Sequence, residues 1–219
     1  MKRFRWLGRM NAYFGNDEPH LAAAGSVALI VAGSQPFYPL YVAAIAGEKF
    51  WPALLTWFST PFFLAVPAVC RRAPLSGRLL LMACAIGNTV VTAAALGPRS
   101  WVELFYLPCL ALAPLLFSGK EAGYGLIASV VGSGVGLLVI HGSHQNGLAT
   151  FDDEQFRSLA RLHGFSVAGL LVVFGFLALR LRRQLRAIAA CHSGHQDTTA
   201  LDHMSVTSYD SHASDHNRP

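Results

Sequence analysis

The feature that most constrains this chain is its alternation of long apolar stretches with short charged breaks. Basic residues gather before the first stretch and after the second, fourth and sixth: Lys2, Arg3, Arg5, Arg9, Arg71, Arg72, Arg78, Lys120, Arg180, Arg182, Arg183 and Arg186. The breaks between them hold only Lys49, Arg99, Arg157 and Arg161. Because Lys and Arg concentrate in cytoplasmic loops, this pattern predicts a polytopic membrane protein with both ends in the cytoplasm.

Each apolar stretch is long enough for one helical crossing, which needs about 20 predominantly apolar residues. We place six crossings, at Leu21–Ala46, Phe50–Cys70, Leu79–Leu96, Trp101–Phe117, Gly123–Ile140 and Leu159–Leu179. The stretches are continuous rather than alternating, which excludes transmembrane β-strands. The expected fold is therefore all-α, a bundle of six transmembrane helices with the N- and C-termini inside.

Two polar regions flank the expected membrane domain, residues 21–186. Residues 1–20 contain a basic and aromatic segment, Phe4–Phe14, which we expect to lie as an amphipathic helix at the cytoplasmic interface. Residues 187–219 are rich in His, Asp and Ser and predict a disordered cytoplasmic tail. The net charge of +5 comes mostly from the inward-facing basic residues. Their natural partners are anionic lipid headgroups, and no nucleic-acid partner is expected.

Few polar residues interrupt the apolar crossings, and those that do are costly and often functional. The first crossing holds Gln35, and the third holds Asn88, which we interpret as an interhelical hydrogen-bonding residue. The fifth crossing is rich in small residues spaced four apart, a pattern that favours close backbone packing. These pairs are Ser129/Ser133 and Gly132/Gly136. Prolines in the first, second and fourth crossings predict kinks.

The most distinctive polar cluster is expected on the outer side. Its members are Glu103, His141, His144, Asp152, Asp153, Glu154 and His163. His and carboxylate groups together bind Zn²⁺ or a similar cation, or titrate near neutral pH as a sensor. His141, His144 and His163 are the candidate metal ligands. The alternative is a hydrated loop whose acidic residues cap a helix beginning near Phe156.

The sixth crossing is expected to continue into the cytoplasm as a helix over Arg180–Ala190. Leu181, Leu185 and Ile188 form a single apolar seam with coiled-coil-like spacing, flanked by arginines. We interpret this seam as a transmitter of helix displacement.

The chain resembles the six-helix membrane domain found ahead of class III adenylate cyclase modules and some histidine kinases in bacteria. The likeness is carried by Glu103–Cys109 and Pro114–Glu121 of the fourth crossing and by the arginine-rich exit at Arg180–Arg186. The polar outer loop before the sixth crossing also fits. The resemblance covers about Leu21–Arg186 and implies a receptor or regulatory anchor in a bacterial inner membrane. We expect no output domain here, so no cyclase or kinase residue is carried over.

The expected function is a stand-alone sensory or regulatory membrane domain that acts through a partner protein or as a homodimer. No catalytic constellation is present in the sequence, so we expect neither an enzyme nor a cofactor. The alternative is a small-molecule transporter or channel subunit, which the proline-broken first and second crossings favour.

Overall fold

The computed structural model describes residues 18–142 and 147–213, with side chains described as far as residue 187. Within these ranges every regular element is a helix, as the continuous apolar stretches predict. The α-helices are α2 (Pro19–Ser34), α3 (Tyr38–Ala46), α4 (Thr60–Arg72), α5 (Pro74–Leu96), α6 (Tyr106–Leu116), α7 (Ala122–Gly142) and α8 (Asp153–Ala213). The 3-10 segments are η1 (Gln35–Phe37), η2 (Gly47–Ser59), η3 (Pro98–Ser100), η4 (Val102–Phe105) and η5 (Gly119–Glu121).

Four stretches of the described chain are long and apolar enough to cross a membrane: Pro19–Arg72, Pro74–Leu96, Gly119–Gly142 and Asp153–Ala187. These stretches confirm the expectation of an all-α fold with membrane-spanning helices.

A fifth, shorter apolar stretch, Val102–Leu116, occupies the place of the expected fourth crossing. Trp101 has a left-handed backbone (φ +62°), and α6 begins only at Tyr106. A left-handed residue cannot belong to a regular right-handed helix. The helix in this part of the chain is therefore shorter than the apolar run suggests.

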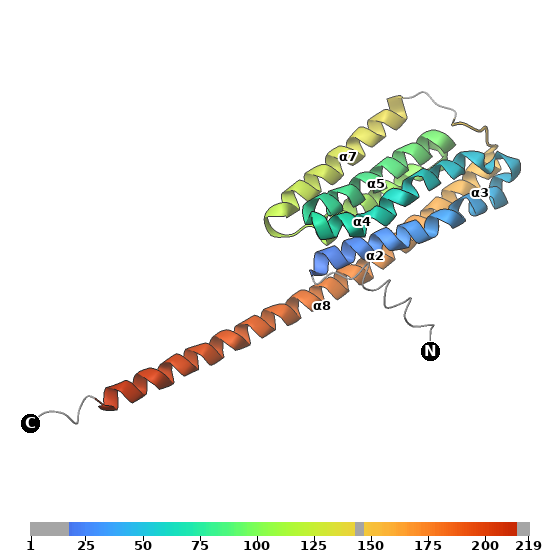
Figure 1. The fold of residues 1–219 in the computed structure, drawn as a ribbon. Coiled ribbons are helices and arrows are strands. Elements are labelled where there is room, and N and C mark those ends of the chain that lie inside the picture. Colours follow the sequence, from blue (N-terminus) through green and yellow to red (C-terminus); the bar gives the residue numbers. More distant parts are fainter. Residues whose placement is uncertain (1–17, 143–146, 214–219) are drawn as a thin grey trace, which may run out of the picture. The chain divides into compact units, whose positions relative to one another are not determined.

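The first of the four long stretches folds back on itself. As one straight helix its 54 residues would extend about 80 Å, far beyond a hydrocarbon core of about 30 Å. Instead, α2 packs against α4 and α3 packs against η2 (Figure 1). The chain reverses after Gly47, whose φ of +58° glycine adopts without strain. Pro36 and Pro39 lie where α2 gives way to η1 and α3, because proline cannot donate the bonds of a continuous helix.

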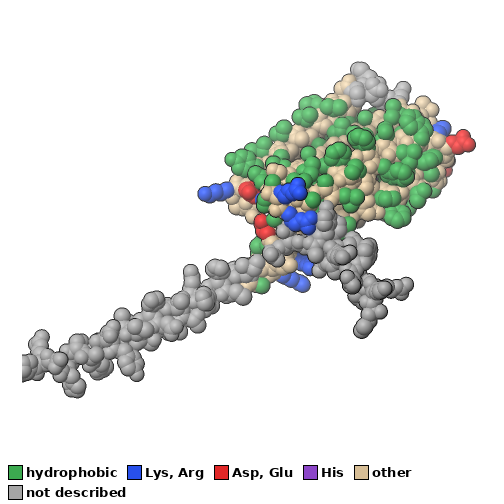
Figure 2. Space-filling model, in the orientation of Figure 1, with side chains coloured by type: hydrophobic (Ala, Val, Ile, Leu, Met, Phe, Trp, Pro, Cys, Tyr) green, Lys and Arg blue, Asp and Glu red, His purple; other side chains and the backbone are tan. Residues whose placement is uncertain are grey.

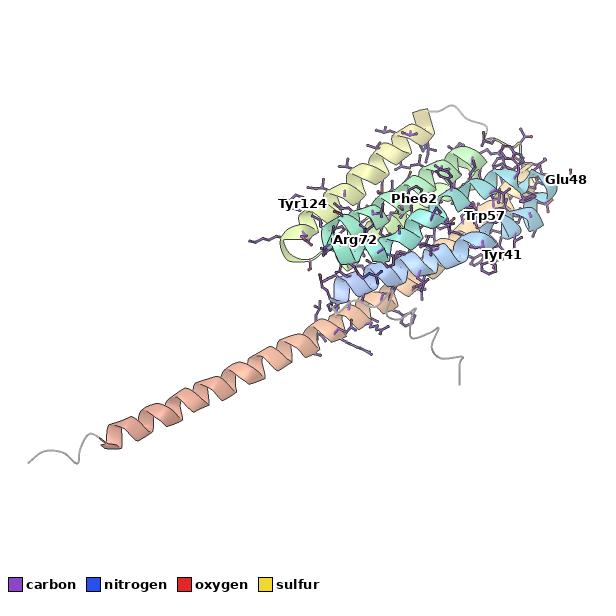
Figure 3. All side chains as sticks on the ribbon, viewed as in Figure 1. Tyr41, Glu48, Trp57, Phe62, Arg72 and Tyr124 are labelled. Carbon is purple, nitrogen blue, oxygen red and sulfur yellow. The ribbon has the colours of Figure 1, made fainter. Side chains whose placement is uncertain are left out.

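The surface of the unit that ends at Ala178 has the polarity expected for a membrane bundle. On the face shown in Figure 2, charged side chains gather towards the two ends and hydrophobic side chains cover the length between them. Figure 3 labels Tyr41, Trp57 and Phe62 on the helical hairpin formed by Pro19–Arg72, and all three side chains are about half exposed. A lipid environment accommodates such an apolar surface, whereas a soluble monomer rarely exposes one of this extent.

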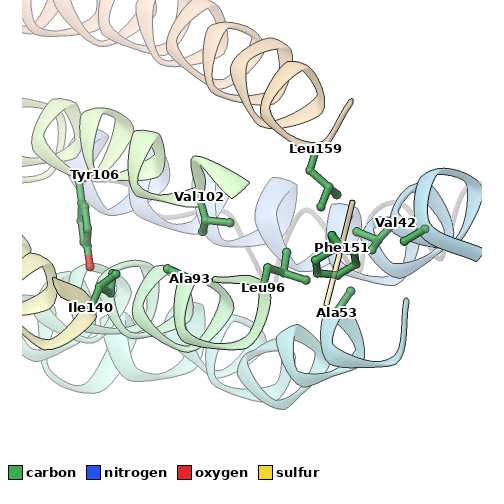
Figure 4. Close-up of a cluster of buried hydrophobic side chains, with 10 residues drawn as sticks. Val42, Ala53, Ala93, Leu96, Val102, Tyr106, Ile140, Phe151 and Leu159 are labelled. Carbon is green, nitrogen blue, oxygen red and sulfur yellow. The ribbon is translucent and has the colours of Figure 1, made fainter. Parts of the chain in front are cut away.

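Helix α5 is the centre of this unit, since it contacts α2, α4, α6 and α7. A buried cluster joins one end of α5 to its neighbours (Figure 4): Val42, Ala46, Ala53, Ala93, Leu96, Val102, Tyr106, Ile140, Phe151 and Leu159. The Leu148 N–H donates to the Ala95 carbonyl (2.7 Å), so the segment before α8 lies against the C-terminal end of α5. This cluster fixes where α8 begins.

The second unit begins at Leu179 and consists of the remainder of α8, which is helical to Ala213. Leu181, Leu185 and Ile188 all lie on this part of the helix, and the side chain of Ile188 is outside the described ones. The sequence places the start of a disordered tail at residue 187, and the structure continues the helix across that position. The proposed interfacial helix around Phe4–Phe14 lies outside the described residues.

Candidate functional site

A cavity of about 350 Å³ lies inside the unit that ends at Ala178. This volume is in the range of small-molecule sites, which are concave and mostly apolar with a few placed polar groups. The lining residues come from α2, η1, α3, η2, α4, α5, η4, α6 and α8. None of the described residues that line it is charged.

Helical periodicity explains which residues reach the cavity. On α2 the lining residues are Val27, Ile30, Val31 and Ser34, spaced three and four apart. The same spacing recurs on α8 from Leu162 to Phe174. Residues spaced in this way share one face of a helix, so each helix turns a single stripe towards the cavity.

Gln35, at the break between α2 and α3, is the centre of the polar part of the lining. Its Nε2 donates to Ser59 Oγ (2.8 Å). The single hydroxyl proton of Ser59 has two acceptors within reach, Asn88 Oδ1 on α5 (2.8 Å) and the Thr56 carbonyl (2.7 Å). The Gln35 carbonyl accepts from the indole Nε1 of Trp57 (3.2 Å). Pro39 cannot donate to this carbonyl as an ordinary residue four positions later would, and the carbonyl accepts instead from the Tyr38 backbone N–H and from Trp57.

Gln35 also holds an unsatisfied polar atom. The residue is only 4% exposed, and its Oε1 has no hydrogen-bond partner within the described part of the chain. Thr89 and Thr92, which line the cavity on α5, donate to the carbonyls of Ala85 and Asn88 in their own helix. Gln35 therefore lines the cavity and holds a buried amide oxygen that the described helices around it leave unpaired.

His163 forms a second buried polar junction, next to the cavity rather than in its lining. Its side chain is fully buried, with Nδ1 2.6 Å from the Ser100 carbonyl and Nε2 2.9 Å from the Tyr38 hydroxyl. A carbonyl only accepts, so Nδ1 carries a proton, and in the neutral ring Nε2 accepts from Tyr38. Tyr38 stacks on the imidazole and Phe105 meets it edge-on. The junction ties α8 to the start of α3 and to η3.

The other described members of the predicted outer cluster make separate contacts. Asp152 Oδ1 accepts from the backbone N–H groups of Glu154 (3.0 Å) and Gln155 (2.8 Å), and so caps α8. Asp153 pairs with Arg99 at 2.5 Å, with both side chains exposed. His141 Nδ1 donates to the Leu137 carbonyl of its own helix.

Glu103 and His144 are the remaining members of the predicted outer cluster. Glu103, on η4, has a buried Oε1 without a hydrogen-bond partner in the described ranges, and His144 lies outside those ranges. The described residues contain no group of three or more His, Cys, Asp or Glu that could hold a metal ion. The sensing role of the cluster stays a prediction.

The small residues of α7 face the neighbouring helices. Ser129 is buried, and its hydroxyl donates to the Cys109 carbonyl of α6 (3.0 Å). Ser133 is also buried. A Cβ at Gly132 would meet Ile86, and one at Gly136 would collide with the Tyr106 hydroxyl. Ser129, Gly132 and Gly136 thus lie where α7 comes close to α5 and α6.

Arg78 has a role that the sequence pattern did not reveal. The sequence groups it with the arginines facing lipid headgroups, whereas its side chain is 4% exposed and pairs with Glu121 at 2.7 Å. Arg78 also donates to the Leu116 carbonyl (2.9 Å) and lies over the Phe117 ring. The structure starts α5 at Pro74, so Arg78 lies in its second turn, whereas hydropathy alone places it in the break before the crossing.

One protein family model matches most of the chain. The MASE7 family model matches residues 20–192, which include every cavity-lining residue and the first part of the second unit. No curated protein matches the chain.

Proposed function

Because the chain belongs to the MASE7 family, a family of membrane-associated sensor domains, we propose that it senses a small molecule bound in the central cavity. The observation that carries this proposal is the buried Oε1 of the cavity-lining residue Gln35, which has no hydrogen-bond partner within the described part of the chain. An unsatisfied polar atom inside a membrane bundle is costly. A ligand that donates to Oε1 would remove that cost, and so would stabilise the arrangement of helices that surrounds it.

The route from the cavity to the rest of the chain is α8. Residues Leu162–Phe174 of this helix supply part of the lining, and the same helix continues without a break to Ala213. A ligand that shifts α8 therefore acts on the seam formed by Leu181, Leu185 and Ile188. In this proposal the seam passes the shift to a partner protein or to a second copy of the chain. The resemblance to cyclase- and kinase-linked domains suggests the class of partner.

A six-crossing topology with both termini in the cytoplasm belongs to this proposal. The hairpin in Pro19–Arg72 supports two crossings there, and Val102–Leu116 supplies the short fourth one. The alternating Lys and Arg pattern supports the orientation and a bacterial inner membrane. Reporter fusions at Arg72 and Lys120 should report the cytoplasm, and one at Asp153 the outside. The opposite pattern would overturn the orientation.

The sensory proposal is tested by filling the cavity. Ala85 lines the cavity on α5, whereas Ala83 on the same helix is exposed and outside the lining. In the full chain, Ala85→Phe should change amide hydrogen exchange over residues 179–190 by about fivefold or more, the lower limit of ordinary allosteric coupling. Ala83→Phe should leave it unchanged. Equal exchange in the two variants would contradict the proposal.

A transporter or channel subunit is the second candidate. It is favoured by the break at Gln35–Phe37, because transporters build substrate sites at interrupted membrane helices. Flux measurements in proteoliposomes separate the two functions. Substrate-dependent flux that Ala85→Phe abolishes would favour transport, and no flux across a broad panel of uncharged solutes would count against it.

A further inference from the structure

The cavity opens towards the side of the bundle. Most lining residues are buried or half-buried, but four are exposed, and they belong to two neighbouring parts of the wall. Ile30 and Ser34 lie on α2, Tyr41 on α3 and Gly169 on α8. Ile30 is 39% and Tyr41 56% exposed. The opening therefore lies along the seam between α2–α3 and α8.

This lateral opening lies within apolar lengths of helix. Ile30, Ser34 and Tyr41 belong to the span Pro19–Arg72, and Gly169 belongs to Asp153–Ala187. Phe165 and Val172, close to Gly169 in sequence on α8, are also exposed apolar residues. In a membrane such a surface meets acyl chains rather than water. A ligand that uses this opening must first dissolve in the bilayer.

The lining chemistry restricts the ligand further. An ionised headgroup would be left unpaired in this cavity, because none of the described lining residues is charged. Gln35 Oε1 is an acceptor that receives no hydrogen bond from the described part of the chain. A volume of about 350 Å³ holds on the order of a dozen non-hydrogen atoms, at about 30 Å³ for each water-sized group.

We propose that the cavity binds an uncharged amphiphile that enters sideways from the bilayer. The ligand has one apolar chain of about ten carbons and a head that donates a hydrogen bond, such as a hydroxyl group. The chain lies along Leu112, Leu170 and Phe174, and the head donates to Gln35 Oε1. The inference rests on the proposed function for its biological purpose, but binding itself is measured without any signalling readout.

The first test is photolabelling of the full chain in lipid nanodiscs with a 1-decanol analogue that carries a mid-chain diazirine. Leu112 and Phe174 are buried lining residues, so label on them reports an occupied cavity rather than contact with surrounding lipid. Competition then compares 1-decanol with decyl methyl ether, which cannot donate. We expect 1-decanol to compete roughly three- to tenfold better, the value of one neutral hydrogen bond. In Gln35→Met the two competitors should become equal.

The second test addresses the lateral opening with a matched pair of α8 variants. A Cβ at Gly169 or at Gly175 meets nothing within 4 Å, so both positions accept a larger side chain, and only Gly169 lines the cavity. Gly169→Phe should abolish label on Leu112, and Gly175→Phe should retain it. Absence of label on Leu112 in the unmodified chain, or equal labelling of the two variants, would overturn the inference.

The outcomes of the binding and signalling experiments distinguish a wrong ligand class from a wrong function. Label on Leu112 without any effect of Ala85→Phe on exchange over residues 179–190 would support the ligand class and refute the sensory function. An effect of Ala85→Phe without label on Leu112 would support sensing and refute a bilayer-derived ligand.

Discussion

Replacing His163 by leucine tests whether the buried junction between α8, α3 and η3 stabilises the bundle. Leucine has nearly the volume of the imidazole, so the packing against Tyr38 and Phe105 is largely retained. The change removes the bonds to Tyr38 Oη and to the Ser100 carbonyl. Both partner groups remain where they are, and the Ser100 residue is fully buried. The main cost is therefore the loss of their hydrogen bonds.

The expected loss in the free energy of unfolding follows from these two unpaired groups, the Tyr38 hydroxyl and the Ser100 carbonyl. Leaving a buried group unpaired costs about 1–3 kcal/mol in water-soluble proteins, whereas side-chain hydrogen bonds within membrane bundles average only about 0.6 kcal/mol. We expect His163→Leu to lower the free energy of unfolding by about 2 kcal/mol, and Tyr38→Phe, which breaks one bond, by about half as much. At about 2–4 °C for each kcal/mol, the leucine variant should melt roughly 4–8 °C below the unmodified chain.

The assay is equilibrium unfolding in mixed detergent micelles, followed by circular dichroism. His141→Leu is the matched control, because His141 is exposed and, among the described residues, its ring bonds to the Leu137 carbonyl of its own helix. The double variant of Tyr38→Phe and His163→Leu should show a coupling energy of about 0.6–1.7 kcal/mol. Equal stability of His163→Leu and His141→Leu, or strictly additive effects in the double variant, would refute the reasoning.

Three further predictions follow from close contacts. Gly136→Leu should lower stability by about 1–3 kcal/mol through overpacking, whereas Gly134→Leu, where a Cβ has open space, should not; thermal melts compare them. Arg78→Met should cost about 1–3 kcal/mol and Glu121→Gln less than about 1 kcal/mol, because the glutamate is 39% exposed; a reversed order in chemical unfolding would contradict the burial of Arg78. Asp152→Ala should cost about 1 kcal/mol and speed amide exchange in the first turn of α8, and unchanged exchange there would argue against the cap.

The class of the protein could be predicted from hydropathy and charge alone. In lipid every backbone polar group needs an internal partner, so long apolar runs without alternation form helices. The family match confirms the interpretation as a membrane sensor domain, and the specific likeness to cyclase- and kinase-linked domains remains a proposal. The start of the fourth apolar helix was harder to predict. Trp101 has a left-handed backbone, and no glycine at this position indicates it in the sequence.

The candidate site was visible from the sequence only in fragments. Gln35 and Asn88 were identified because polar residues are rare in the crossings, yet Ser59, which joins them, lies among ordinary turn and helix residues. His163 was grouped with the outer loop by its place in the chain, whereas folding brings it to Tyr38, which is 125 positions away. Sequence position indicates depth in the membrane, but it does not indicate which helix lies beside which.

The sequence by itself determined that the chain is a helical membrane protein, because the hydropathy of each segment acts locally. Only the tertiary structure decided that the cavity-lining residue Gln35 holds a buried amide oxygen without a partner among the described residues, that Arg78 pairs with Glu121, and that α2, α3 and α8 line one cavity. Each of these depends on which helices become neighbours. The choice of neighbours is set by the packing of many side chains at once and by no short motif.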